Sequence, residues 1–492
     1  MEIKWSNETT VADILNGLEE KCKDYKFLKR KVCDKVVETL VKIPPQIFAG
    51  LETLAWDIPL GTCATLHQCK MECCDEGAAP EQLHLSLASK DRSLMGITWV
   101  TLNSNESVVQ YGLNADDLSN IAIGEINTYK QAGWIGNIHR AMMSKLEPAQ
   151  VYYYRVGNPS TNLWSEVFSF RTFDPSASSV KYAVLADMGY GSASDDTVKQ
   201  LEQLVNQNKL DVVIHSGDVS YADGFETHWD TYFNKIQNIA ARVPYMVTPG
   251  NHEFWYNFAA YKARFLMPSV GSNVDSDSKT GSGDNMWYSW EYGNTHFEAM
   301  NSETALDTAK FHKDELDYAN NDLASVDRSQ TPFVITHFHR PLYCSNDGEC
   351  TNNNNGDKVN KLTEEGEELF NSNKVDLCLT GHVHEYERTY PVYQSKVVTK
   401  SFDNDGTSPF APIYIVQGAS GNREGNKGGF PDEASGKLPE WHAGGSVEVG
   451  YGLLDIDSAI TAANNKGLNT LRWNYYRSSD NELLDNFTLT KK

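Results

Sequence analysis

Long apolar runs and an excess of positive charge are both missing from this chain of 492 residues. No stretch of about 18 uninterrupted apolar residues occurs, so a transmembrane helix is not expected. The formal net charge is −23 and the pI is about 5.0, which disfavours nonspecific attraction to nucleic acid or to anionic lipid. Hydrophobic residues make up 40% and charged residues 22%, which is typical of folded rather than disordered proteins.

Cysteine is missing from the middle of the chain, between residues 75 and 343. The nine cysteines lie near the start and in the last third instead. They are Cys22, Cys33, Cys63, Cys69, Cys73, Cys74, Cys344, Cys350 and Cys378. The crowding within the first 75 residues predicts a disulfide module or, alternatively, a metal knuckle.

A signal peptide is also missing, because the opening MEIKWSNETT contains no apolar core. Glycosylation sequons nevertheless occur at Asn7, Asn105 and Asn486. Together with the cysteines, the sequons favour a secretory route, to the outside of the cell or to a lysosome or vacuole. Two explanations stay open: the protein remains inside the cell, or the N-terminus of this chain is incomplete.

Residues 1–75 are predicted to be helical. VADILNGLEEKC and CDKVVETLVKI place apolar residues at helical spacing, and QIFAGLETLAW resumes the pattern after two prolines. EKCKDYKFLKRKVC and PLGTCATLHQC resemble parts of a saposin B-type domain, a small lipid-interacting helical fold. The resemblance implies a disulfide between Cys22 and Cys33 and possible contact with lipid or a membrane surface.

The saposin pattern also requires a C-x2-C pair on a first helix, and this chain has none upstream. Its absence fits an N-terminus that lacks one helix and a signal peptide. Alternatively, Cys73 and Cys74 have become the partners of Cys63 and Cys69, or the segment is an unrelated helical cap.

Residues 80–175 are predicted to form an antiparallel β-sandwich of the fibronectin type III kind. Short runs that alternate in polarity, or are rich in β-branched and aromatic residues, are separated by turn residues. They are EQLHLSLA, LMGITWVTL, SVVQYGL, VYYYRVGN and VFSFRTF. Few of these side chains suit chemistry, so we expect the sandwich to pack beside the next domain, with His139 structural or lining its rim.

Residues 180–492 alternate strand-forming and helix-forming segments. KYAVLAD precedes DDTVKQLEQLVNQ, and LDVVIHSGD precedes ETHWDTYFNKIQNIA. This alternation predicts an α/β sheet with ligand-binding groups at the carboxyl ends of its strands. The whole chain is therefore expected to be an α+β multidomain protein. Its length agrees with this, because a chain of this size usually contains roughly three domains.

Five of these strands end alike, because an apolar run stops at a small residue or turn and a ligand-type side chain follows. The segments are VLADMG, HSGDVSY, TPGNHE, HFHRP and TGHVHE. They carry Asp187, Asp218, Tyr221, Asn251, His252, His337, His339, His382 and His384. Oxygen and imidazole ligands without cysteine suit iron, zinc or manganese. These candidate ligands are more numerous than one tetrahedral ion can bind, so we expect two metal ions. A pair of metal ions is the usual arrangement in enzymes that catalyse displacement at phosphorus.

The same blocks, in the same order, resemble those of the purple acid phosphatase family of metallophosphoesterases: D-x-G, G-D-x-x-Y, G-N-H-E, a His before R-P, and G-H-x-H. The tails IVQGASGNREG and NYYRSSDNELLDNFTLTKK extend the resemblance, which covers residues 80–492. It implies a four-layer α/β/β/α metallophosphoesterase domain over residues 180–492. The ligands it implies are Asp187, Tyr221 and His384 for a ferric ion, Asn251, His339 and His382 for a divalent zinc, iron or manganese ion, and Asp218 as the bridge.

The resemblance implies an acid phosphatase that hydrolyses phosphate monoesters by attack of a metal-bound hydroxide, without a covalent phosphoenzyme. Asn251 and His252 would face the substrate, and His252 would stabilise or protonate the leaving oxygen. The phenolate of Tyr221 on ferric iron would give the family's purple colour. Small phosphate esters are the expected substrates, and the oligomeric state stays open.

The pair of histidines in HFHRP is ambiguous. The family's ligand directly precedes a residue-Pro-x-Tyr sequence, which selects His339 and leaves His337 a supporting or structural role. His215, inside a strand run, is expected to be a buried structural histidine. Plant members carry further phosphate-facing histidines where this chain reads CSNDGEC. Here Cys344 and Cys350 are expected to form a small disulfide loop, whereas Cys378 is expected to be a buried free thiol.

Two other functions remain in view. A phosphodiesterase or a sphingomyelinase-like lipid phosphoesterase would also combine a saposin domain with this catalytic fold. A lipid-binding protein with a vestigial phosphatase is the non-enzymatic alternative, and the complete ligand set argues against it.

Overall fold

The structure is a computed structural model, and it describes residues 71–74, 77–268, 281–303, 311–346, 356–404, 410–426, 429–431, 438–457 and 469–491. Glu72–Tyr129 and Ile135–Lys492 form one compact unit, and Met1–Met71 with Lys130–Trp134 form another. Three short elements, β1 (Met71–Glu72), η1 (Gln131–Gly133) and β7 (Trp134–Ile135), include residues of the second unit. Of the segment 1–75 that was predicted to be helical, the structure describes only residues 71–74, and there Met71–Glu72 form the strand β1 rather than a helix. Asn7, Cys22 and Cys33 lie outside the described residues.

The first part of the large unit is a sandwich of two antiparallel sheets, with orders β2-β3-β8-β6 and β10-β9-β4-β5; β11 also pairs with β9. Its strands are β2 (Glu81–Ser86), β3 (Met95–Thr101), β4 (Val108–Gly112), β5 (Asn120–Ile123), β6 (Glu125–Asn127), β8 (Asn137–Met143), β9 (Val151–Asn158), β10 (Leu163–Trp164) and β11 (Phe168–Arg171). Alternate side chains of both sheets, such as Leu85, Trp99 and Tyr154, fill one buried core. This sheet-rich domain agrees with the predicted sandwich, while its fibronectin type III assignment stays a prediction.

The second part contains two seven-stranded mixed sheets, one ordered β14-β13-β12-β25-β26-β27-β22 and the other β15-β16-β17-β18-β23-β19-β24. The first comprises β12 (Ser179–Leu185), β13 (Val212–Ser216), β14 (Tyr245–Thr248), β22 (Asp403–Asn404), β25 (Gly450–Asp457), β26 (Asn469–Arg477) and β27 (Leu483–Lys491). The second comprises β15 (Tyr288–Tyr292), β16 (Thr295–Ala299), β17 (Phe333–His337), β18 (Leu377–Thr380), β19 (Tyr386–Thr389), β23 (Ile413–Gln417) and β24 (His442–Ser446). A two-stranded ribbon pairs β20 (Val392–Tyr393) with β21 (Lys396–Val397).

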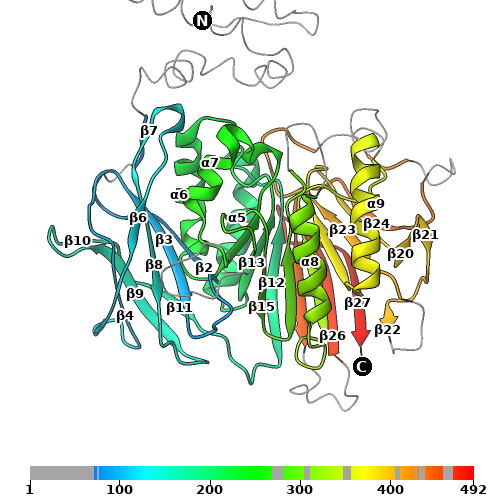
Figure 1. The fold of residues 1–492 in the computed structure, drawn as a ribbon, viewed down its shortest axis with the longest axis horizontal. Helices are drawn as coiled ribbons and strands as arrows, with labels where there is room; N and C mark the ends of the chain where they lie inside the picture. Colours follow the sequence, from blue (N-terminus) through cyan, green and yellow to red (C-terminus); the bar gives the residue numbers. More distant parts are fainter. Residues whose placement is uncertain are drawn as a thin grey trace, which may run out of the picture. The chain divides into compact units, whose positions relative to one another are not determined.

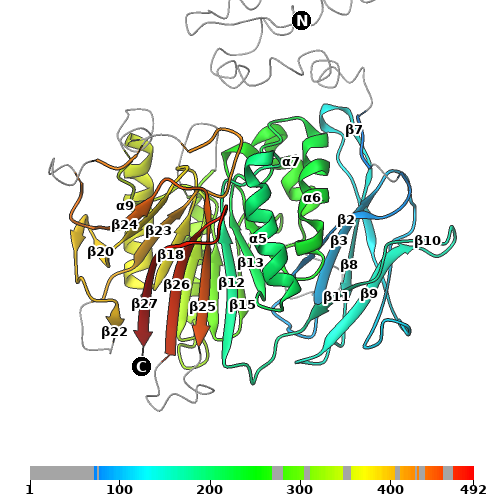
Figure 2. The same cartoon turned by 180° about the vertical axis from the view of Figure 1, so that it is seen from behind.

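The two sheets face each other. The ring of Tyr182 on β12 lies 5.1 Å from that of Phe297 on β16. Further along, Trp473 Nε1 on β26 donates to the hydroxyl of Tyr386 on β19 at 3.0 Å. Helices cover their outer faces (Figures 1 and 2). They are α5 (Asp195–Asn206), α6 (Glu226–Ala240), α7 (Trp255–Arg264), α8 (Lys313–Ser325) and α9 (Gly356–Ser372), with the short η2 (Ser192–Ser194) and η3 (Asn251–Glu253).

Each sheet has its own helices. On α6, Tyr232 hydrogen-bonds Tyr245 of β14, whereas Leu323 of α8 and Phe370 of α9 join a core cluster with Val334 of β17. The order of layers is helix, sheet, sheet, helix, as expected for residues 180–492. Among the described helices, none is long and apolar enough to span a membrane.

The sandwich is packed against α6 and α7. His84 of β2 stacks on Phe233 of α6, with ring centroids 4.4 Å apart. The guanidinium of Arg140 on β8 donates to three carbonyl oxygens around the end of α7, at 2.6–2.8 Å. His139 is buried and hydrogen-bonded to Thr101 and Ser107. His139 therefore has a structural role inside the sandwich, which is one of the two roles expected for it.

The cysteines divide into three cases. Cys73 and Cys74 are joined to each other, so the alternative in which they pair with Cys63 and Cys69 is wrong in this structure. Cys344 is disulfide-bonded, and its expected partner Cys350 lies outside the described residues. Cys378 is a buried free thiol, as predicted.

Candidate metal centre

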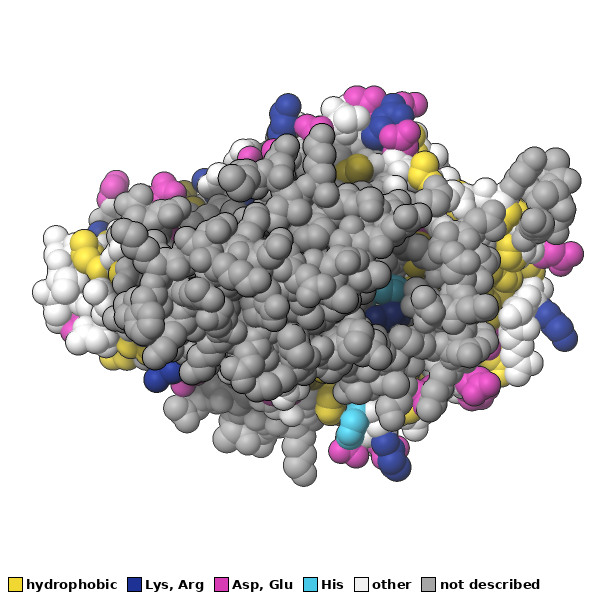
Figure 3. Space-filling view, turned by 90° about the horizontal axis from the view of Figure 1, so that it is seen from above, with side chains coloured by type: hydrophobic (Ala, Val, Ile, Leu, Met, Phe, Trp, Pro, Cys, Tyr) yellow, Lys and Arg dark blue, Asp and Glu magenta, His cyan; other side chains and the backbone are white. Residues whose placement is uncertain are grey.

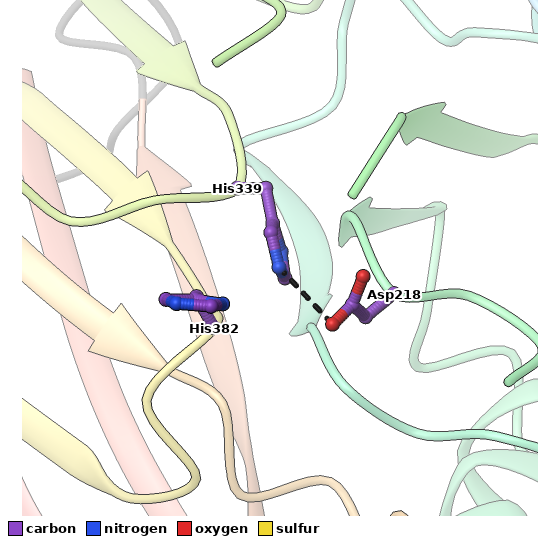
Figure 4. A group of neighbouring side chains, drawn as sticks. All are labelled: Asp218, His339 and His382. Carbon is purple, nitrogen blue, oxygen red and sulfur yellow. Dashed lines mark ion pairs between the residues drawn. The ribbon is translucent and has the colours of Figure 1, made fainter. Parts of the chain in front are cut away.

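The predicted ligands follow the carboxyl ends of neighbouring strands. β12, β13 and β14 are parallel to one another, and so are β17 and β18. The side chains after these strands therefore meet at one edge of the sandwiched sheets. Figure 4 shows Asp218, from the loop after β13, converging with His339 and His382, which follow β17 and β18. The ligand atoms of these three residues all lie within 4.8 Å of one another.

His339 is at the middle of this group. Its Nε2 lies 3.1 Å from Asp218 Oδ2 and 3.1 Å from Asn251 Oδ1. Its Nδ1 donates to the carbonyl oxygen of Ser216 at 3.1 Å. Because Nδ1 carries the hydrogen, the lone pair of Nε2 is free to bind a metal.

A second group lies beside the first. The hydroxyl of Tyr221 donates to Asp187 Oδ1 at 3.1 Å and lies 3.0 Å from His384 Nε2. The Nδ1 of His384 hydrogen-bonds the carbonyl oxygen of Gly425 at 3.1 Å, which again leaves Nε2 directed at the oxygen ligands. Asp187 Oδ2 accepts a hydrogen bond from the backbone N–H of His382 at 2.7 Å, which links the two groups.

The negative charge of the buried carboxylates favours the binding of cations at this site. Asp187 and Asp218 are 0% and 1% exposed. Within the described part of the chain, neither forms an ion pair with lysine or arginine; their charged neighbours are histidines, with Asp218 3.1 Å from His339 and Asp187 3.5 Å from His384. Two buried carboxylates held only by titratable histidines remain costly. Burial raises the pKa of Asp187, and burial together with both carboxylates raises the pKa of Tyr221 well above its usual value. A bound cation would reverse both effects, so these residues fit a metal centre.

Backbone conformation is strained where the ligands are presented. Asp187, Asp218, Tyr221 and His382 have φ values of +54°, +48°, +55° and +70°, in the left-handed region that non-glycine residues seldom adopt. Such residues cluster at functional sites because the surroundings hold them there.

Two further features hold the loops close together. The buried carboxylate of Glu253 accepts the backbone N–H groups of Val219 and Gly250, at 3.0 and 2.9 Å, and so ties the loops after β13 and β14. A Cβ atom at Gly250 would lie 2.9 Å from Asp218 Cγ and would overlap its Oδ1 and backbone nitrogen. Only glycine allows this approach.

His252 lies at the edge of the centre. Its backbone N–H donates to Asp218 Oδ1 at 2.9 Å, and its ring centroid lies 4.1 Å from that of Tyr221, with the two rings tilted by 35°. Asp223 Oδ1 holds Nδ1 at 2.5 Å, while Nε2 lies 3.7 Å from both Asp218 Oδ2 and Glu424 Oε1. Nε2 is therefore the nitrogen that faces the site.

Sequence reasoning missed several residues here. Asp223 also pairs with Arg423, and the guanidinium of Arg423 donates to the hydroxyl of Tyr190 at 3.2 Å. Asp223 could have been found two residues after Tyr221 in GDVSYAD. Arg423 and Glu424 come from a loop about 200 residues away. They lie within IVQGASGNREG, which extends the family resemblance, but that segment alone does not indicate that they approach Asp223 and His252.

Arg340, inside the HRP block, was also given no role. Its Nε donates to Glu303 Oε1 at 2.7 Å and its Nη1 lies 2.8 Å from His382 Nε2. It thus brings a positive charge to the divalent side of the centre. On the face seen from above, a histidine and a basic side chain are visible next to each other (Figure 3).

Two histidines lie away from the centre, in line with the predictions. His337 is buried and accepts a hydrogen bond from Trp290 Nε1 at 3.3 Å. His215 is buried and bonds the hydroxyl of Tyr245 at 2.8 Å. In the CSNDGEC stretch, Ser345 and Asn346 bond the buried carboxylates of Glu387 and Glu385.

Comparison with known proteins gives matches along most of the chain. Three family models match: "Purple acid Phosphatase, N-terminal domain" over residues 80–172, "Calcineurin-like phosphoesterase" over residues 180–386 and "Iron/zinc purple acid phosphatase-like protein C" over residues 411–486. In fold, the chain is similar to a purple acid phosphatase from yellow lupin seeds, with a TM-score of 0.70 and 24% identity, covering 84% of this chain and 75% of that one.

Curated relatives are more similar in sequence. Acid phosphatase type 7 of Danio rerio is 34% identical over 407 residues, which is 77% of this chain and 86% of the relative. Purple acid phosphatase 18 of Arabidopsis thaliana is 32% identical over 413 residues, which is 82% of this chain and 83% of the relative. Acid phosphatase type 7 of Homo sapiens is 34% identical over 366 residues, 70% of this chain and 79% of the relative. With these matches and the site described above, the chain belongs to the purple acid phosphatase family.

Proposed function

We propose that this chain hydrolyses phosphate monoesters at a binuclear metal centre. The main support for the proposal is that two groups of potential metal ligands lie side by side, with Asp218 between them. The proposed ligands are Asp187, Tyr221 and His384 for one ion, Asn251, His339 and His382 for the other, and Asp218 between them. Relatives named acid phosphatase and purple acid phosphatase support the reaction class.

The donor sets favour different ions. A phenol, a carboxylate and an imidazole suit ferric iron, while an amide oxygen and two imidazoles suit divalent zinc, iron or manganese. When bound, such ions polarise the phosphoryl group and lower the pKa of attacking water. A visible absorption band that disappears in the Y221F variant, with folding retained, would support the iron assignment, whereas colourless protein with two zinc ions per chain would remove it.

The protein's own groups orient and protonate the substrate. Asn251 and His252 occupy one loop turn beside the ligand groups, so a phosphate oxygen bound there would meet both. Asp223 holds Nδ1 of His252 and leaves Nε2 facing the site. We assign His252 Nε2 as the donor of a proton to the leaving oxygen, a role that typically contributes 10²–10⁴-fold in rate.

A comparison of substrates tests the function. We expect p-nitrophenyl phosphate to be cleaved faster than bis(p-nitrophenyl) phosphate and sphingomyelin at acid pH. Faster cleavage of either diester would replace the phosphomonoesterase with a phosphodiesterase or lipid phosphoesterase. A D218N variant, which removes the shared carboxylate, should abolish all three activities.

The cellular route belongs to the same proposal. Asn105 and Asn486 are exposed, as glycosylation requires, and the acidic composition suits a secreted, lysosomal or vacuolar enzyme. A decrease in mass after treatment of the native protein with an N-glycosidase would support this route; unmodified asparagines at both positions would oppose it. We propose domain boundaries at 80–175 and 180–492, after the 1–75 segment that carries possible lipid contact.

A further inference from the structure

A second group of ligand-type side chains lies on other elements, between β16 and α8. It consists of His296, Glu298 and Asp322, whose ligand atoms all lie within 4.8 Å of one another. His296 and Glu298 are two residues apart on β16 and so share one face of the strand. Phe297, between them, faces the other sheet and contacts Tyr182. Asp322, on the last turns of α8, faces the strand from outside.

The buried atoms of this group lack hydrogen-bond partners. Glu298 is 0% exposed and neither of its carboxylate oxygens has a hydrogen-bond partner. His296 is 3% exposed. Its Nε2 lies 2.8 Å from Asp322 Oδ2, which is ion-pair distance, although the two atoms do not have the geometry of a hydrogen bond. Leaving a buried polar atom unsatisfied costs about 1–3 kcal/mol, so several such atoms aimed at one place call for a ligand there.

The nearby lysine and arginine side chains lie against other atoms than these. Lys90 Nζ lies 3.2 Å from Asp322 Oδ1, the other oxygen of that carboxylate. Arg92 Nη2 lies 3.5 Å from Glu291, which is opposite His296 in the β15–β16 ladder. Asp322 is also close to the carboxyl end of α8, whose last turn contains no basic residue, and a helix end of this kind favours a cation.

We propose that His296, Glu298 and Asp322 bind a divalent transition-metal ion, such as zinc or manganese, separately from the binuclear centre. One imidazole and two carboxylates form a common donor set for these ions, whereas calcium and magnesium prefer oxygen ligands alone. The ion would join β16 to α8 and stabilise the edge of the second sheet.

Metal stoichiometry tests this site in the full-length protein. After saturation with zinc and removal of free metal, the E298Q variant should contain one zinc ion fewer per chain than the wild type. Its phosphatase activity should be retained within about twofold, because Glu298 is not among the proposed ligands of the binuclear centre. The matched control is D317N, since Asp317 lies on the exposed side of α8, with 62% of its side chain accessible. D317N should bind as much zinc as the wild type.

A second variant covers the case in which E298Q does not fold. H296Q keeps a polar side chain of similar reach and should lose the same single equivalent. Equal zinc content in the wild type and either folded variant would overturn the proposal and leave Glu298 as a buried protonated acid.

Discussion

Substitution of Gly250 by alanine tests how tightly the central carboxylate is held. Gly250 has φ −114° and ψ −175°, an extended conformation that alanine adopts without strain. The cost therefore comes only from contact, because the added Cβ would overlap Asp218 Oδ1 and the backbone nitrogen of Asp218. Asp218 is itself left-handed, with φ +48°, and cannot yield by a small rotation. Overpacking of this kind typically costs about 1–3 kcal/mol, which a folded domain survives.

The effect on the centre should be much larger than the effect on stability. A shift of about 1 Å in Asp218 exceeds the roughly 0.2 Å tolerance of metal–ligand distances and would break the 3.1 Å approach to His339. Misplacement by that amount can reduce the rate about 10²-fold. We therefore expect G250A to remain folded, bind fewer metal ions and lose at least 100-fold in kcat.

Three measurements on purified protein decide the matter: metal ions per chain by atomic emission, kcat with p-nitrophenyl phosphate, and the thermal midpoint. G429A is the matched control, because a Cβ atom at Gly429 meets nothing within 4 Å. Full metal content and near-normal kcat in G250A would refute the argument that this glycine positions Asp218.

Three other predictions concern single side chains. The H339N variant should lose metal, whereas H337N should keep it and lose only stability, which metal analysis and thermal unfolding would separate. The H252Q variant should lower kcat more for alkyl phosphates than for p-nitrophenyl phosphate, because a poor leaving group needs the proton more; equal losses would indicate a merely structural role. Burial raises the pKa of Glu226 to about 7 from a usual 4.5, so its neutral form is favoured on folding, and this contribution is complete below about pH 4.5 and lost as the pH rises through 7. The E226Q variant should therefore match the wild type in urea unfolding near pH 4 and exceed it near pH 8.

Strands and helices of the catalytic part were predictable because each has a strong local pattern. VLADMG and HSGDVSY are apolar runs that stop at a turn, and in the structure they are the ends of β12 and β13. The antiparallel strands β25 and β26, by contrast, carry alternating patterns that do not reveal which sheet they join. Their place beside β12 depends on pairing across more than 200 residues, and local periodicity contains no information about such pairing.

The second cluster shows a similar limit at the level of side chains. His296 and Glu298 alternate on a strand as many polar residues do, and Asp322 lies on a helix of mixed polarity. Nothing in their spacing distinguishes them from solvated side chains. Only the packing of α8 over β16 makes Glu298 a buried acid without a hydrogen-bond partner.

The two His-x-His pairs have the same spacing but different geometry. In HFH, the strand β17 continues to His337, which packs on Trp290, and the chain turns toward Asp218 only afterwards, at His339. In HVH, His382 adopts a left-handed conformation with φ +70°, and its backbone N–H bonds Asp187. That reversal directs His382 toward His339 and His384 toward Tyr221, so one pair serves two ligand groups. Identical spacing therefore has different consequences, because a strand fixes the side of its residues whereas a left-handed turn changes it.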